Sequence, residues 1–561
     1  MALVDWTIIT VFIVLSLVAG LWVSRRASQD VSSYFLGGGK FPWWAIGFSM
    51  VATTFAADTP LAVTEYIRAL GIWRNWFWWC LAIGHVLAAI LFAPLWKRSG
   101  MLTDNQLIEL RYGGRPAALL RAIKALYFSV FFNILVMAWV IAAMSTSIEH
   151  FLGVNSKVAV VVCLAVALVY STASGFWGVV VTDVIQFVFA MTGTIIFAFF
   201  AVAQVGGMDA LLEKLQSGGL LEHATVFPQG GFHNWADLAV FLGIMWWANH
   251  NADGGGYIIQ RMLSAKSEKE SERGTLFFTF FHYVVRFWPW ALVALVSLVL
   301  IPEVPGKDAY PKLLAQILPA GWRGLYVAVF LAAFMSTIDT HLNWGASYLV
   351  NDLYRRFINT AASEKRCLLV GRLATVLLLL AAGLSSFFIE RISGAWELVW
   401  ALGAGLGPVL ILRWLWWRIS AWSEIAAMAG SLFLAVAIEV AGKIFGFSPE
   451  LYQKALLIVP FSAIIWLTVT WLMPAESSEV LEIFMDRVCP PGRWPRRHPW
   501  PKGMLWRWAG GVLFIYGMLF AVGSFILRKY ETSALLFATA VLGAIMFIYK
   551  SQAQPSPGKT D

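Results

Sequence analysis

Apolar stretches long enough to span a bilayer recur along the whole chain, separated by short polar segments. A helix needs about 20 mainly apolar residues to cross roughly 30 Å of hydrocarbon. By length and periodicity we expect about fifteen such spans, and an alternation of period two is not evident, so the pattern predicts an all-α polytopic membrane protein. The approximate span limits are 3–24, 42–70, 73–96, 120–147, 155–174, 178–205, 237–260, 274–301, 320–350, 367–388, 394–418, 421–445, 454–473, 507–527 and 532–549.

Two of these spans contain polar breaks near their middles. Residues 56–60 read Ala-Ala-Asp-Thr-Pro, and residues 249–256 read Asn-His-Asn-Ala-Asp followed by three glycines. A carboxylate in hydrocarbon costs roughly 2.5–3.5 kcal/mol, and each glycine costs roughly 1 kcal/mol of helix propensity relative to alanine. Broken backbone at membrane depth is tolerated only where it is buried in protein or lines a wet cavity. Two interrupted spans at corresponding places therefore point to the binding site of a transporter.

The positions of the breaks also predict how the chain is organised. The ten spans within 42–418 divide into five plus five, and each half opens with an interrupted helix. An odd number of spans per half inverts the topology of the second half, as in inverted-repeat transporters. The expected segments are an extra N-terminal helix with its cytoplasmic loop (1–41), a first inverted repeat (42–205), an extracellular loop (206–236), a second inverted repeat (237–418), C-terminal helices (419–550) with a cytoplasmic loop (474–506), and a disordered tail (551–561).

Composition and charge support a membrane location. Charged residues make up 13% of the chain, against about 25% in soluble domains. The net charge of +9 falls mostly in alternate loops, which is the positive-inside pattern of membrane proteins rather than a patch for nucleic acid. We therefore expect a multi-pass protein of the inner or plasma membrane, with the N-terminus outside and the C-terminus in the cytoplasm. The four scattered cysteines predict no disulfide framework.

The span 320–350 carries side chains suited to binding a small cation. On a helix, Ala333, Ser336, Thr337 and Thr340 share one face at spacings of three and four residues. Hydroxyl and carbonyl oxygens can replace the water around such an ion, although serines and threonines in membranes often bond back to their own backbone. Asp339 in the same span favours the functional interpretation, because an intramembrane carboxylate is by default a functional-site hypothesis.

Asp183 is a second carboxylate in an apolar stretch, one turn into the span 178–205 and with Gln186 on nearly the same face. Two interpretations stay open for it. It is either a capping or interfacial carboxylate near the inner membrane surface, or a coupling-ion ligand or proton carrier.

Several local patterns in order along the chain resemble the sodium:solute symporter family. They are Ser33-Tyr34-Phe35-Leu36 with three glycines and Pro42-Trp43-Trp44, Thr182-Asp183 with Gln186, Gln260-Arg261-Met262-Leu263, and Ala333-Phe334-Met335-Ser336-Thr337 running on to Asn343 and Asn351-Asp352. The resemblance runs from the first span to about residue 418. It implies a LeuT-like five-plus-five inverted repeat with one extra N-terminal and about four extra C-terminal helices.

The same resemblance implies where ions bind. The matching positions of a sodium site are the carbonyls of Ala56, Thr59 and Ala333 and the hydroxyls of Ser336 and Thr337. Some family members carry a second cation site, which here corresponds to Asp183, Ser336, Asp339 and Thr340. Asp339 departs from the small polar residue that is usual there. We therefore expect Na⁺ as the coupling ion, with one or two ions per cycle.

The solute is expected to bind between the two breaks. The candidate residues are Asp58, Trp246, Asn249, His250, Asn251 and Asp253. Glu65 and Arg68 are further candidates, and the alternative for them is that, three residues apart on a helix, they pair with each other. Acids, amides and aromatic rings suit a polar, hydroxylated solute, and we favour a sugar or a sugar-like molecule.

The leading interpretation is a sodium-coupled symporter that imports a small polar solute by alternating access. Its expected partners are the solute, sodium and the lipid bilayer, and no nucleic acid. A transporter-like membrane sensor is one alternative. A polytopic membrane enzyme that uses Asp253, His250, Asp339 and His341 is another, although no HExxH or CxxC motif supports a transition-metal site.

Overall fold

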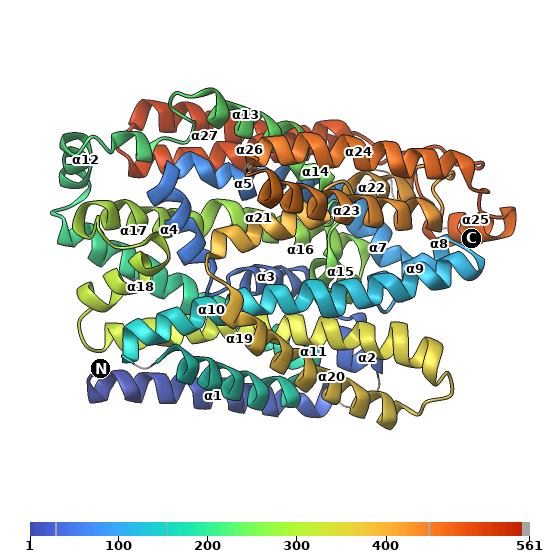
Figure 1. Ribbon diagram of the computed structural model, residues 1–561, viewed down its shortest axis with the longest axis horizontal. Coiled ribbons are helices and arrows are strands. Elements are labelled where there is room, and N and C mark those ends of the chain that lie inside the picture. Colours follow the sequence, from blue (N-terminus) through green and yellow to red (C-terminus); the bar gives the residue numbers. More distant parts are fainter. Residues whose placement is uncertain (28–30, 154, 447–448, 552–561) are drawn as a thin grey trace.

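The computed structural model describes residues 1–27, 31–153, 155–446 and 449–551, and these residues are almost entirely helical (Figure 1). Most helices run along the long axis of the molecule. Within the described residues, ten helical segments are long and apolar enough to cross a membrane, or twelve if each of two bent pairs counts as one span. The prediction of an all-α polytopic membrane protein is confirmed.

The segment predicted as the first repeat begins with a bent pair of helices, α3 (Trp43–Thr54) and α4 (Thr59–Leu70), which meet at 56°. The break between them lies where Asp58 and Pro60 were expected to interrupt the span. The helical stretches that follow are Ile72–Ser99, Gly114–Leu152, which includes α10 (Asn133–Leu152), and α11 (Ser156–Gln204). A single helix, α11, thus covers the two spans predicted at 155–174 and 178–205.

The second predicted break is present at 249–255. Helix α14 (Trp246–Ala248) ends because Asn249 adopts an extended conformation, and α15 (Gly256–Ser264) begins after Gly254 and Gly255. These two glycines have φ values of +131° and +75°, which residues with a Cβ rarely adopt. The remaining helices of this region are α13 (Phe232–Val240), α16 (Glu268–Phe280), α17 (Phe287–Leu300), α18 (Gly306–Ile317), α19 (Trp322–Tyr348) and α20 (Glu364–Ser385).

A third break interrupts the span that was predicted to run unbroken over 394–418. Helices α21 (Ile392–Gly403) and α22 (Gly407–Leu415) are bent by 45°. The backbone N–H of Gly405 donates to the Ala248 carbonyl at 2.8 Å, so the third break lies directly against the second. The expectation of a continuous helix was wrong, because Gly403, Gly405, Gly407 and Pro408 lower the helix propensity here without any charged residue.

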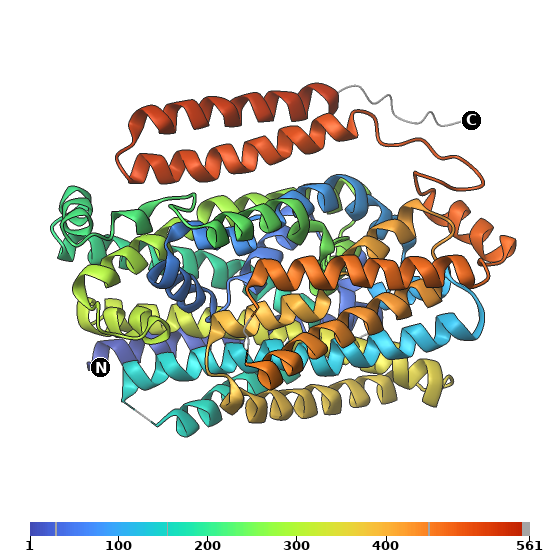
Figure 2. The same ribbon diagram turned by 45° about the horizontal axis from the view of Figure 1, so that its top comes forward.

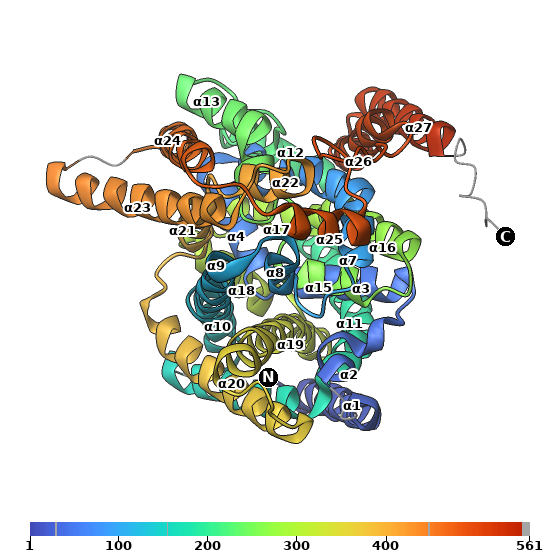
Figure 3. The same cartoon turned by 90° about the vertical axis from the view of Figure 1, so that its right-hand side faces the viewer.

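Helix α19 lies at the centre of the bundle, and the C-terminal helices lie at its rim (Figure 3). In its most apolar stretch, 94% of the residues are buried. The pair α23 (Ala421–Phe445) and α24 (Leu451–Leu472) covers one side. The hairpin of α26 (Met504–Ile526) and α27 (Tyr530–Ser551) packs along another side (Figure 2). The predicted loop 474–506 contains α25 (Ser478–Val488), and nearly all of the predicted tail lies outside the described residues. The other helices named in Figure 1 are α1 (Leu3–Ala27), α2 (Val31–Leu36), α5 (Trp76–Trp79), α7 (Ala93–Ser99), α8 (Leu107–Arg111), α9 (Gly114–Leu126) and α12 (Met208–Ser217).

Glu65 and Arg68 do not pair with each other, so that alternative is wrong. The Glu65 carboxylate accepts from the backbone N–H of Ser393 at 3.0 Å. The Arg68 guanidinium donates to the carbonyls of Ser297 and Val304 at 2.8 and 2.7 Å. Each side chain thus ties α4 to a different neighbouring helix, because both neighbours present unpaired backbone groups near their ends. All four cysteines are free, as expected.

Candidate functional site

Two adjoining cavities lie between the broken helices. The central cavity, of about 260 Å³, is lined by the second break and by aromatic side chains from several helices. The first-break cavity, of about 190 Å³, lies beside the break between α3 and α4. The two cavities share the lining residues Trp78, Val136, Trp139, Tyr257, His341 and Trp396. Together they form one region, lined mainly by apolar and aromatic side chains with a few polar ones, beside the two predicted breaks.

The first-break cavity brings together most of the predicted sodium ligands. Ala56, Thr59 and Thr337 all line it. The Thr337 hydroxyl donates to the carbonyls of Thr53 and Ala333 at 2.8 and 3.0 Å. This contact joins the end of α3 to the middle of α19, and it gathers hydroxyl and carbonyl oxygens, which suit a small hard cation.

Ser336 faces a different neighbour from Thr337. Its hydroxyl donates to Asp183 Oδ1 at 2.5 Å, and the hydroxyl of Ser49 donates to Asp183 Oδ2 at the same distance. Asp183 is fully buried, and its two oxygens join α3 and α19 to α11. Ser49 lies one turn before Thr53 on α3, and both were missed by sequence reasoning, although a spacing of four residues places the two hydroxyls on one helix face.

A buried arginine occupies the region of the predicted second cation site. The Arg261 guanidinium lies 3.8 Å from Asp183 Oδ2 and donates to the hydroxyl of Thr340 at 2.6 Å. It also donates to Ser49 at 3.1 Å, and it is fully buried. Asp339 is buried beside Thr340 on α19. The site therefore already holds one positive charge, a feature that sequence reasoning missed although Arg261 belongs to the quoted Gln260-Arg261 pattern.

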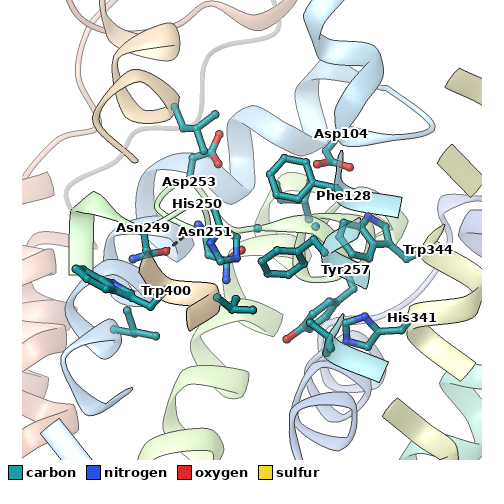
Figure 4. Close-up of a pocket in the computed structure, with 18 of the residues that line it drawn as sticks. Asp104, Phe128, Asn249, His250, Asn251, Asp253, Tyr257, His341, Trp344 and Trp400 are labelled. Atoms are coloured by element: carbon teal, nitrogen blue, oxygen red, sulfur yellow. Dashed lines mark hydrogen bonds between the residues drawn. The ribbon is translucent and has the colours of Figure 1, made fainter. Parts of the chain in front are cut away.

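The second break supplies four candidate solute residues to the central cavity, Asn249, His250, Asn251 and Asp253, shown in Figure 4. The Asn249 side chain caps the broken helix, because it donates to the Met245 carbonyl and accepts from the Asn251 N–H, at 2.8 and 2.7 Å. His250 packs edge-on against Phe132 with 4.5 Å between ring centroids, and its buried Nδ1 has no hydrogen-bond partner among the described residues. His250 and Asn251 are therefore better placed than Asn249 to contact a solute.

Asp253 and Trp246 have structural partners. The Asp253 carboxylate accepts from Arg413 at 2.6 Å and from the Trp414 indole at 2.9 Å, so it ties the second break to α22. The Trp246 side chain packs against Trp508 of α26, with 5.7 Å between ring centroids. Trp246 is not among the residues that line the two cavities.

Asp58 lies in the first-break cavity. Its Oδ2 accepts from the Trp396 indole at 2.9 Å, and its buried Oδ1 has no partner within the described part of the chain. His341 lines both cavities, and its Nδ1 lies 2.6 Å from the amide oxygen of Asn133. No group of three or more His, Cys, Asp or Glu residues among the described residues is placed to hold a metal ion, so the geometry offers no support for a metalloenzyme.

Comparison with known proteins identifies the family. The model of the sodium:solute symporter family matches residues 34–433. A sodium/glucose cotransporter of Vibrio parahaemolyticus is 26% identical over 466 residues, which cover 78% of this chain and 85% of that protein. A sodium/mannose cotransporter of Bos taurus is 28% identical over 435 residues, 70% of each chain.

A solved structure of a substrate-bound, outward-open Na⁺-coupled sialic acid symporter shares the fold. Its TM-score is 0.69 at 19% identity, and the match covers 85% of this chain and 99% of that one. The predicted LeuT-like fold is therefore confirmed. The relatives are transporters, which excludes the enzyme alternative. Family match and fold together show that the chain belongs to the sodium:solute symporter family, as a sodium-coupled symporter of a small solute.

Proposed function

We propose that this symporter imports a small hydroxylated, sugar-like solute together with sodium by alternating access. The observation that carries the proposal is the convergence of the broken helices on the two adjoining cavities. Broken helices leave backbone N–H and C=O groups that need polar partners at membrane depth, and an ion and a polar solute supply them. The named relatives include transporters of glucose and mannose, which supports a sugar-like solute.

The sodium ion is proposed to bind at the first break. Its ligands are the carbonyls of Ala56, Thr59 and Ala333 and the hydroxyls of Ser336 and Thr337. The contact of Thr337 with the carbonyls of Thr53 and Ala333 supports this assignment. Because Arg261 already brings a positive charge to Asp183 and Thr340, we propose one coupling sodium per cycle in this arrangement. The second cation site at Asp183, Asp339 and Thr340 stays a prediction.

The solute is proposed to occupy the central cavity, with His250 and Asn251 as its polar contacts on the second break. Aromatic rings surround these two residues, and Figure 4 shows Trp400 on one side of them and Trp344 with His341 on the other. Flat apolar ring faces flanked by hydrogen-bonding groups suit a sugar, whose faces carry C–H groups and whose edges carry hydroxyls.

The proposed orientation places the N-terminus outside and the C-terminus in the cytoplasm, with the protein in the inner or plasma membrane. In Figure 1 the ends of α7 and α8, the start of α9 and α25 gather at one end of the bundle. Arg98, Arg111, Arg115 and Arg487 belong to these elements. Basic residues are enriched in loops on the cytoplasmic side, so this end is assigned to the cytoplasm.

Uptake into proteoliposomes tests the proposed function. The purified chain is reconstituted, and uptake of labelled sugars is compared under an inward sodium gradient and an equal potassium gradient. Sodium-driven accumulation above the external concentration is the expected result. Solute binding without any sodium-driven accumulation would contradict the proposal and favour a membrane sensor.

A further inference from the structure

Arg286 is a buried cation in the wall of the first-break cavity, and it has no ion pair within the described residues. Its Nε donates to the His282 carbonyl at 2.9 Å, and Nη1 donates to the carbonyl and hydroxyl of Thr54. Nη2 lies 2.9 Å from His282 Nε2, which leaves one of its two N–H groups without an acceptor in the described part of the chain. Trp78 and Trp290 cover the guanidinium from distances of 5.6 and 5.5 Å.

The lack of an ion pair sets Arg286 apart from the other buried arginines. Arg74, Arg121, Arg261, Arg413 and Arg507 each have a carboxylate within 4.0 Å. Within the described residues, Arg286 and Arg111 are the buried arginines with no carboxylate within that distance. Arg111 donates to backbone carbonyls and is not among the residues that line the two cavities. Arg286 is therefore the buried, unpaired guanidinium that faces the binding region.

In the central cavity the bases Lys124 and Arg413 already have carboxylate partners, Glu424 and Asp253. The charged residues that line the first-break cavity are Asp58 and Arg286, whose charges cancel. A sodium ion bound at the first break adds one positive charge to this set. A buried charge without a partner is strongly unfavourable, and a solute with one negative charge would restore the balance.

We propose that the solute carries a carboxylate and is a sugar acid of the hexuronate type, with its carboxylate on Arg286. This inference rests on the proposed function. Hydrogen bonds from a guanidinium to a carboxylate are charge-assisted and stronger than neutral ones, and Arg286 is held in place by Thr54 and His282 for such a contact. The unpartnered Oδ1 of Asp58 lies in the same cavity and accepts a hydroxyl of the sugar.

The test compares three probes in proteoliposomes that contain the full chain. D-glucuronate and D-glucose differ by the carboxylate, and pyruvate offers a carboxylate without a sugar ring. We expect sodium-driven uptake to prefer glucuronate over glucose by about tenfold to a hundredfold, the effect of one hydrogen bond to a charged group. We expect little uptake of pyruvate.

Variants assign the preference to Arg286. Arg286→Gln should lose the preference for glucuronate, whereas Arg286→Lys should keep part of it, because lysine retains the charge but not the planar fork. Arg111→Gln is the matched control, since it removes another buried, unpaired guanidinium away from the cavities and should leave the preference unchanged. Size-exclusion profiles and thermal unfolding show whether each variant is folded. The comparison of the three probes on the unaltered chain tests the proposal even if a variant does not fold.

The outcomes separate this inference from the proposed function. Sodium-driven uptake in which glucose equals or exceeds glucuronate would overturn the sugar acid while supporting sodium-coupled symport. Uptake of pyruvate without either sugar would keep the carboxylate and overturn the sugar ring. If no probe is taken up, the sugar acid is overturned, and if sodium also leaves thermal unfolding unchanged the proposed function fails with it.

Discussion

The ion pair between Asp183 and Arg261 offers the sharpest test of how this site is built. Both side chains are fully buried and 3.8 Å apart, in the contact between α3, α11, α15 and α19. Two unit charges at about 4 Å attract by about 4 kcal/mol at an effective dielectric constant of about 20. Removing one partner of a buried pair typically costs about 3–5 kcal/mol, because the other charge is left without compensation.

We therefore expect Asp183→Asn to lower the free energy of unfolding by about 3–5 kcal/mol. The double variant Asp183→Asn with Arg261→Gln should recover most of that loss, since it leaves no uncompensated charge. Unfolding in mixed micelles, titrated with dodecyl sulfate and followed by circular dichroism, measures the four members of this double-mutant cycle. Running the cycle in sodium and in potassium distinguishes Asp183 as the ion-pair partner of Arg261 from Asp183 as a sodium ligand. Strictly additive losses, or a loss seen only in sodium, would refute the ion pair as the main role of Asp183.

The same geometry predicts the sodium stoichiometry. A sodium ion placed about 4 Å from the Arg261 guanidinium would be repelled by about 4 kcal/mol, which weakens its binding by about a thousandfold. The unaltered chain should therefore show a Hill coefficient near one for sodium-dependent uptake. Arg261→Gln, which leaves Asp183 without its partner, should raise that coefficient. A Hill coefficient of two in the unaltered chain would show that sodium enters the second site despite the guanidinium.

Three further predictions concern single side chains. Thr337→Ala should raise the sodium concentration for half-maximal uptake by about tenfold, the effect of one lost oxygen ligand, whereas Thr337→Ser should stay near the unaltered value. Asn251→Ala should raise the apparent KM for the solute more than the sodium constant, and the opposite pattern would move the solute site elsewhere. Gly407→Ala should lower the yield and thermal stability of folded protein, because its Cβ would lie 1.9 Å from the Trp247 carbonyl. Gly243→Ala, whose Cβ meets nothing within 4 Å, is the matched control, and equal stability of the two variants would contradict the close packing.

Two of the three breaks were predictable because their residues conflict with a membrane helix. Asp58 with Pro60, and Asp253 with three glycines, impose penalties that an unbroken span cannot offset. The third break, at 404–406, carries no charge, and the residues in and beside it, Gly403, Gly405, Gly407 and Pro408, are of types common in ordinary membrane helices. A contact distant in sequence, the hydrogen bond from Gly405 to Ala248, joins this break to the second one. Hydropathy and propensity along one segment do not contain that contact.

The candidate site was predicted in part, and the errors have a common origin. Polar side chains near a break bind either to the unpaired backbone groups of the broken helix or to a ligand. The residue types are the same in both cases, so the sequence does not distinguish the two roles. Asn249 and Asp253 bond to the backbone and to the neighbouring helix. His250 and Asn251 line the same cavity, and the buried Nδ1 of His250 has no partner among the described residues. Arg286 was not predicted as a site residue, because the candidates in apolar stretches were acids, amides and hydroxyls, and no arginine of the span 274–301 was among them.

The network that joins the breaks also indicates which parts move together during transport. The second and third breaks share the hydrogen bond between Gly405 and Ala248, the ion pair between Asp253 and Arg413, and the close approach of Gly407 to the Trp247 carbonyl. Separating them would expose several buried polar groups at once, each of which costs about 1–3 kcal/mol when left unpaired. The first break is joined to α19 by the hydroxyl of Thr337, a contact that a bound sodium ion would reinforce. Arg261 of α15 is bonded in the same way to Ser49 of α3 and Thr340 of α19. Alternating access is therefore expected to keep α14, α21 and α22 as one unit and α3, α15 and α19 as another, and to place the main displacement between the two. The sodium ion and the solute then lie on either side of the surface that moves, and this is how the binding of one affects the binding of the other.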